Sequence, residues 1–140
     1  MDDEIKLLFE KALSTLESAR KNIEINEYST SINRSYYAAY YIASALLLKK
    51  GIKSKKHSGT IQQFSLHFVQ NDSFSIESFK FFTKLWKISD FSMLENQRFS
   101  KLEEDGIHAD YNLFSHYTKK KAKKDLENAK KFIEECEKFL

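Results

Sequence analysis

The chain contains no proline and only three glycines in its 140 residues. A β-rich domain of this length needs many tight turns, and tight turns prefer these two residue types. The scarcity of both therefore favours an all-α protein in which a few helices are joined by few connections. Cys136 is the only cysteine, so an intramolecular disulfide is excluded.

Long hydrophobic runs are also missing, since no stretch approaches the roughly 20 apolar residues that span a bilayer. The segment Met1–Glu4 is acidic, whereas the start of a signal peptide is basic. We therefore expect a cytoplasmic protein without a membrane segment. The hydrophobic fraction is 41%, with 12 Phe and 7 Tyr, which is ample for one core. The length predicts a single domain.

Apolar residues recur every three or four positions in several segments, as is typical of amphipathic helices. We expect an up-and-down helical bundle of about five helices. The first should bury Leu7, Leu8, Ala12, Leu16, Ala19 and Ile23. The expected helices cover residues 3–25, residues from a cap at Ser29 or Thr30 to Gly51, residues 58–70, residues 75 to at least 88 with a resumption over 93–102, and residues 119–140.

The second expected helix is apolar or aromatic almost all round from Tyr36 to Leu48. A helix that faces solvent on one side shows a polar stripe, which this one lacks. It should therefore be central in the domain or be covered by a second copy of the chain. Its tyrosines are expected in the core or at a dimer seam, with Tyr37 and Tyr41 at the seam; the alternative is stacking on nucleic-acid bases.

The order of short elements along the chain resembles small stand-alone members of the HEPN superfamily, of the UPF0332 type. The elements are Arg34–Ala38, a leucine-rich helix end, Gly51, Lys55–Ser58 and later Ala109–Tyr111, and the resemblance covers residues 10–140. It implies a small, usually dimeric, all-α bundle. Such members are often encoded beside a small nucleotidyltransferase in toxin–antitoxin or defence systems, and many cut RNA without a metal.

The ribonuclease signature of that superfamily is an Arg followed, after four to six residues, by a His. This spacing brings a proton-transfer group beside a cation that stabilises phosphate charge. None of the three arginines of this chain has a His at that distance, and Gly106 stands where stand-alone members commonly carry an Arg. We therefore expect a binding module without standard ribonuclease activity. The alternative is a metal-independent ribonuclease that uses His57, or His108 with Arg98.

Basic side chains give the candidate nucleic-acid contacts. Arg34 either holds a phosphate or a partner's carboxylate, in a pocket at the dimer seam with Asp110 and Tyr111, or pairs structurally with an acid such as Asp110. Lysines at the start of a helix are unfavourable next to the positive end of the helix dipole. An anionic partner would explain their presence there, and a generally lysine-rich composition is the simpler alternative. The predicted contacts to RNA are Arg34, Lys55, Lys56, His57, Lys119, Lys120 and Lys123. For His57, a cap or loop hydrogen bond is the simpler alternative.

Metal and cofactor binding are not expected. The three glycines are isolated, so no phosphate-cradling loop is present. The expected partners are a second copy of the chain, a nucleotidyltransferase protein and RNA. The potential metal ligands lack the usual short spacings: His57, His67, His108, His116 and Cys136.

Overall fold

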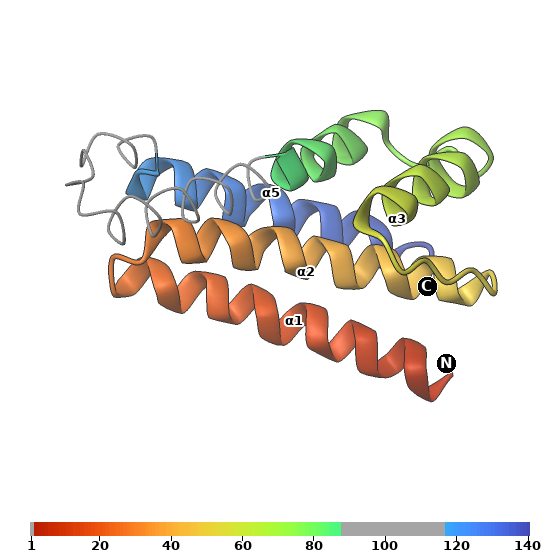
Figure 1. Cartoon of the computed structure of the whole chain (residues 1–140), viewed down its shortest axis with the longest axis horizontal. Coiled ribbons are helices and arrows are strands. Elements are labelled where there is room, and N and C mark those ends of the chain that lie inside the picture. The colour runs from red at the N-terminus through yellow and green to blue at the C-terminus, as the bar shows by residue number, and fades with distance from the viewer. Residues whose placement is uncertain (1, 88–116) are drawn as a thin grey trace, which may run out of the picture.

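The computed structural model describes residues 2–87 and 117–140, and these form an all-α bundle. As expected, the architecture is that of a small helical bundle; in Figure 1, α1 and α2 form an antiparallel pair and α5 runs beside α2. The labelled helices are α1 (Asp3–Glu24), α2 (Tyr28–Lys49), α3 (His57–Phe64), η1 (Ser65–Gln70) and α5 (Lys119–Glu137). A further helix covers residues 76–87.

The first helix begins and ends with local signals. The side chain of Asp2 caps its start by accepting a hydrogen bond of 2.7 Å from the backbone N–H of Glu4. Its end is closed by Asn26, whose φ of 62° lies in the left-handed region. One expected core residue is misplaced: Leu7 is 64% exposed, because it lies two positions, and hence about 200° round the helix, from the buried Ile5.

The second helix is central, as its composition predicted, and it packs against α1, α3 and α5. Tyr36, Ile42 and Leu46 are at most 1% exposed. The expected cap, Ser29 or Thr30, was wrong, because the helix begins at Tyr28 with Glu27 at the N-cap position. Its end is as expected: Gly51 adopts a φ of 76°, and its N–H bonds the carbonyl of Leu48 at 2.8 Å.

The segment expected as one helix over 58–70 is instead α3 followed by the π-helical η1. The wider turn of a π-helix changes which carbonyls are satisfied within the helix. Lys50 adds contacts to this segment, since its Nζ donates to the carbonyl of His67 at 2.8 Å and to Oδ2 of Asp72 at 2.6 Å. The same Nζ lies 4.4 Å from the centroid of the Phe68 ring. Lys50 therefore ties the end of α2 to η1.

Phenylalanines fill the space between α2, α3, α5 and residues 76–87. Phe82 and Phe132 pack with ring centroids 4.9 Å apart, and Phe64 contacts both. All three are fully buried. None of the helices in the described residues combines the length and hydrophobicity that a bilayer crossing requires.

Candidate functional site around His57

His57 is the first residue of α3 and lies against tyrosines of the central helix. Its Nδ1 is 2.6 Å from the hydroxyl of Tyr36. The imidazole stacks on the Tyr40 ring with centroids 4.2 Å apart and planes 16° apart, and it meets the Tyr37 ring edge-on at 5.5 Å. We call Tyr36, Tyr37, Tyr40, Tyr41 and His57 the tyrosine–histidine cluster.

The cluster forms because the tyrosines recur at helical spacing on α2 and because the chain turns back to place α3 against them. Tyr36 and Tyr40 are four positions apart, so they share a face of α2, and Tyr37 and Tyr41 share the neighbouring face. The loop of residues 51–56 then brings α3 back onto this part of α2. Tyr36 is 1% exposed, whereas the other members are partly buried. The expectation that the tyrosines lie in the core is confirmed for Tyr36.

Burial lowers the pKa of His57 below its ordinary value of 6.5. The imidazole is therefore mainly neutral at pH 7. A neutral imidazole carries one N–H donor and one acceptor nitrogen, so it can take up a proton. Because Nδ1 is held by Tyr36, the chemistry open to a bound molecule belongs to Nε2.

Two cations flank the cluster on its outer side. The guanidinium carbon of Arg34 lies 4.9 Å from the centroid of the Tyr37 ring, and Nη2 donates to Oδ1 of Asn33 at 2.8 Å. Nζ of Lys11, from α1, lies 4.5 Å from the centroid of the Tyr41 ring. Arg34, Tyr37 and Tyr41 form one stripe along α2 at spacings of three and four. Two neighbouring tyrosine rings on this stripe are therefore each covered by one cation, Tyr37 by Arg34 and Tyr41 by Lys11.

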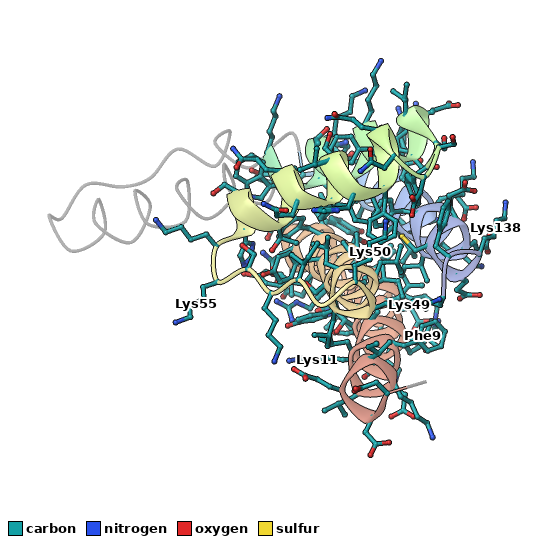
Figure 2. All side chains as sticks on the ribbon, turned by 90° about the vertical axis from the view of Figure 1, so that its right-hand side faces the viewer. Phe9, Lys11, Lys49, Lys50, Lys55 and Lys138 are labelled. Carbon is teal, nitrogen blue, oxygen red and sulfur yellow. The ribbon has the colours of Figure 1, made fainter. Side chains whose placement is uncertain are left out.

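The lysines around Gly51 are not equivalent. Nζ of Lys49 donates to the carbonyl oxygens of Phe139 and Leu140 at 3.1 and 3.0 Å, and Lys50 binds η1 as described above. In Figure 2 the labelled Lys55 side chain extends away from the bundle. Lys55 and Lys56 are exposed and form no ion pair within residues 2–87 and 117–140.

The lysines at the start of α5 form a separate surface. Thr118 caps this helix by accepting from the N–H of Lys121 at 3.1 Å, and Lys119, Lys120 and Lys123 are exposed. Figure 1 places the start of α5 and the loop of residues 51–56 toward opposite ends of the bundle. The predicted nucleic-acid contacts are therefore divided between two surfaces rather than gathered in one patch.

Several candidate residues lie outside the described residues: Arg98, Gly106, His108, Asp110 and Tyr111. The pairing of Arg98 with His108 and the pocket with Asp110 and Tyr111 stay predictions. Within the described residues, no carboxylate pairs with Arg34 and no three potential metal ligands gather.

Sequence reasoning missed one cation of this site, Lys11, and one buried carboxylate on α5, Asp125. Lys11 lies on α1 and reaches the cluster only because α1 packs against α2. Asp125 is a buried carboxylate, 2% exposed, whose Oδ1 accepts from Lys121 at 2.8 Å. Its spacing of four from Lys121 on α5 was the available signal.

The fold and the cluster define a small helical-bundle domain with an Arg–aromatic stripe on its central helix. The HEPN domain family matches residues 5–139, and the chain belongs to this family. "Putative toxin MJ0142" of Methanocaldococcus jannaschii is 32% identical over 83 residues, which are 59% of this chain and 56% of that protein. "UPF0332 protein PH1297" of Pyrococcus horikoshii is 48% identical over 56 residues, 40% of this chain and 39% of that protein.

These matches span about half the length of the relatives or less. The crystal structure of TT1696 from Thermus thermophilus has a TM-score of 0.78 to this chain, covering 99% of it and 100% of the other chain. The sequence identity of that pair is 18%, so the likeness concerns the fold alone.

Proposed function

We propose that this chain is the toxin-like component of a paired toxin–antitoxin or defence system, in which it acts as a dimeric module that binds RNA or a nucleotide. A nucleotidyltransferase protein is the proposed partner. Membership of the HEPN family supports the proposal, as does the similarity to a M. jannaschii protein whose name carries the word toxin. The residues that match that protein are about half of each chain.

The observation that carries the proposal is the stripe of Arg34, Tyr37 and Tyr41 beside His57. Proteins that bind single-stranded nucleic acids combine aromatic rings, on which bases stack, with cations that contact the phosphates. Arg34 and Lys11 each lie over a tyrosine ring of the cluster, so both components occur within one surface. Lys55 and Lys56, which directly precede His57, add positive charge nearby.

Binding without cleavage is the form of the proposal that the sequence favours, because no Arg is followed by a His at the distance the family uses. A second candidate is a metal-independent ribonuclease with a non-standard pair. The observation in its favour is that His57 and Arg34 both contact the ring of Tyr37. A neutral imidazole of lowered pKa is suited to accept a proton from a 2′-hydroxyl.

An RNA assay separates the two candidates. Purified chain is incubated with total RNA in EDTA, and binding and cleavage are scored in parallel for the wild type, His57→Ala, His108→Ala and Arg34→Gln. We expect retarded but intact RNA for the wild type and weaker binding for Arg34→Gln. His67→Ala, a histidine in η1 outside the cluster, is the matched control. EDTA-resistant cleavage that is lost in His57→Ala or His108→Ala but kept in His67→Ala would establish the ribonuclease.

The proposed assembly has its own test. Light scattering at micromolar concentration is expected to give the mass of a dimer, and co-expression with a nucleotidyltransferase encoded beside the gene is expected to yield a co-purifying complex. Tyr37→Asp places a charge in the half-buried stripe and should shift the protein toward monomers if Tyr37 lies at the seam. A stable wild-type monomer would remove the dimer from the proposal.

A further inference from the structure

A cavity of about 260 Å³ lies between the start of α1, the end of α2 and the loop of residues 51–56. It is distinct from the tyrosine–histidine cluster, although Thr60 adjoins both, since its Oγ1 lies 3.5 Å from the hydroxyl of Tyr40. The function proposed above shares only Lys55 with this cavity. Its lining falls into an apolar part and a charged part.

The walls are apolar. Leu8 from α1, Leu47 and Leu48 from α2, and Ile52 from the loop surround the cavity, with hydroxyls of Ser44, Ser54 and Thr60 between them. Contact with such walls favours an apolar ligand, because apolar surface is removed from water. At about 30 Å³ for each water in the liquid, the volume holds on the order of nine non-hydrogen atoms. An aliphatic chain of medium length fits this size.

The mouth carries charge of mainly one sign. Glu4, Lys53 and Lys55 are exposed and line the cavity on the solvent side. Nζ of Lys53 lies 3.2 Å from Oε1 of Glu4, so these two charges offset one another. Lys55 has no ion pair in the described part of the chain. The mouth therefore has an excess of one positive charge, which a single negative head group complements.

We propose that this cavity binds a medium-chain aliphatic carboxylate. The aliphatic chain lies between Leu8, Leu48 and Ile52, and the carboxylate lies at the mouth beside Lys55. An ammonium head group is disfavoured there, because it would meet the excess positive charge. A neutral head group gains the apolar contacts but lacks the ion pair, so it binds more weakly.

The test titrates the full chain with octanoate, octan-1-ol, octyltrimethylammonium and AMP, and follows the methyl NMR signals of Leu8, Leu47, Leu48 and Ile52. We expect octanoate to shift these signals saturably and to bind about fivefold more tightly than octan-1-ol, the ratio that one exposed ion pair of about 1 kcal/mol provides. Octyltrimethylammonium should bind more weakly than octan-1-ol, because it meets the excess positive charge, and AMP should leave the signals unchanged. The proposal is overturned if octanoate does not saturate by millimolar concentration, if octan-1-ol binds equally well, or if AMP alone shifts the signals.

Two variants locate the binding. Lys55→Gln is expected to weaken octanoate about fivefold and to leave octan-1-ol unaffected. Lys138→Gln is the matched control, because Figure 2 shows Lys55 and Lys138 on opposite sides of the bundle. Ser44→Leu fills the cavity from α2 and should abolish binding of both molecules. Lys55 is exposed, so its variant is decisive even if Ser44→Leu fails to fold: equal octanoate affinity of Lys55→Gln and Lys138→Gln overturns the proposal.

Discussion

The hydroxyl of Tyr36 and Nδ1 of His57 form a hydrogen bond of 2.6 Å although 21 positions separate the two residues. The bond fixes the start of α3 on the central helix and determines which imidazole nitrogen is left for a ligand. Tyr36 is fully buried and also stacks on Phe82, so the bond is anchored in the core. His57 thus holds α3 on the central helix through Nδ1, and its Nε2 is left for a ligand.

The lowered pKa of His57 predicts a pH-dependent stability. In the unfolded chain the imidazole protonates near its ordinary pKa of 6.5, whereas in the folded chain it protonates only at lower pH. Between these two values the unfolded state binds more protons, so the free energy of unfolding falls as the pH drops below about 6.5. Urea denaturation at pH 7.5, 6.5 and 5.5 should show a smaller loss for His57→Gln than for the wild type. His67→Gln removes a histidine outside the cluster and is the matched control. Identical profiles for His57→Gln and the wild type would contradict this prediction.

The ion pair of the buried Asp125 with Lys121 leads to a second prediction, in which the effect of a substitution on the free energy of unfolding depends on pH. Burial raises the pKa of the Asp125 carboxyl, although the Nζ of Lys121 at 2.8 Å opposes the rise. Lys121→Met leaves the carboxylate buried without its cation, at a cost on the order of 2 kcal/mol at pH 7. The cost should shrink as the pH falls toward 4, because the carboxyl then becomes neutral in the folded state. Lys120→Met, an exposed neighbour, should change the free energy of unfolding little at either pH.

Substitutions at Gly59, in the first turn of α3, and at Ser54, in the loop before it, are predicted to be coupled. A Cβ added at Gly59 would overlap Oγ of Ser54, whose hydroxyl donates to the carbonyl of Lys56 at 3.1 Å. Gly59→Ala therefore breaks a hydrogen bond worth about 1 kcal/mol, which offsets the gain in helix propensity. In the Ser54→Ala background the clash is absent, and Gly59→Ala should stabilise by about 0.5–1 kcal/mol. A double-mutant cycle by urea denaturation measures the coupling, and additive effects would show that the two positions do not meet.

The exposed lysines at the start of α5 predict salt-dependent RNA binding. Replacing Lys119, Lys120 and Lys123 with Gln should weaken binding and flatten its dependence on salt, because fewer counterions are released. Stability should be unchanged or slightly raised, since like charge is removed from the positive end of the helix dipole. Lys130, Lys131 and Lys138 are exposed lysines farther along the same C-terminal segment, and their Gln variant is the control with equal charge change. Equal salt slopes for the two variants would show that the α5 start is ordinary solvated surface.

The sequence by itself determined the helical class and the place of the central helix. The lack of proline left few ways to build turns, and the residues from Tyr36 to Leu48 lack a polar stripe, so the helix that holds them had to be covered. The helix ends that depend on local chemistry, at Gly51 and Thr118, were also predictable. Local rules failed at the π-helical η1, whose His67 carbonyl accepts a hydrogen bond from Lys50, just after the end of α2.

Only the tertiary structure decided how the site is assembled. Arg34 and His57 belong to different helices, and no spacing rule joins residues across a loop whose path is set by packing. The contact of Lys11 with Tyr41 depends on how α1 lies against α2. The division of the lysines likewise follows from the fold, because Lys49, Lys50 and Lys53 find partners that are distant in sequence, whereas Lys55 and Lys56 do not within the described residues. The composition determines how many lysines are present, and the packing of the helices determines which of them remain available to a ligand.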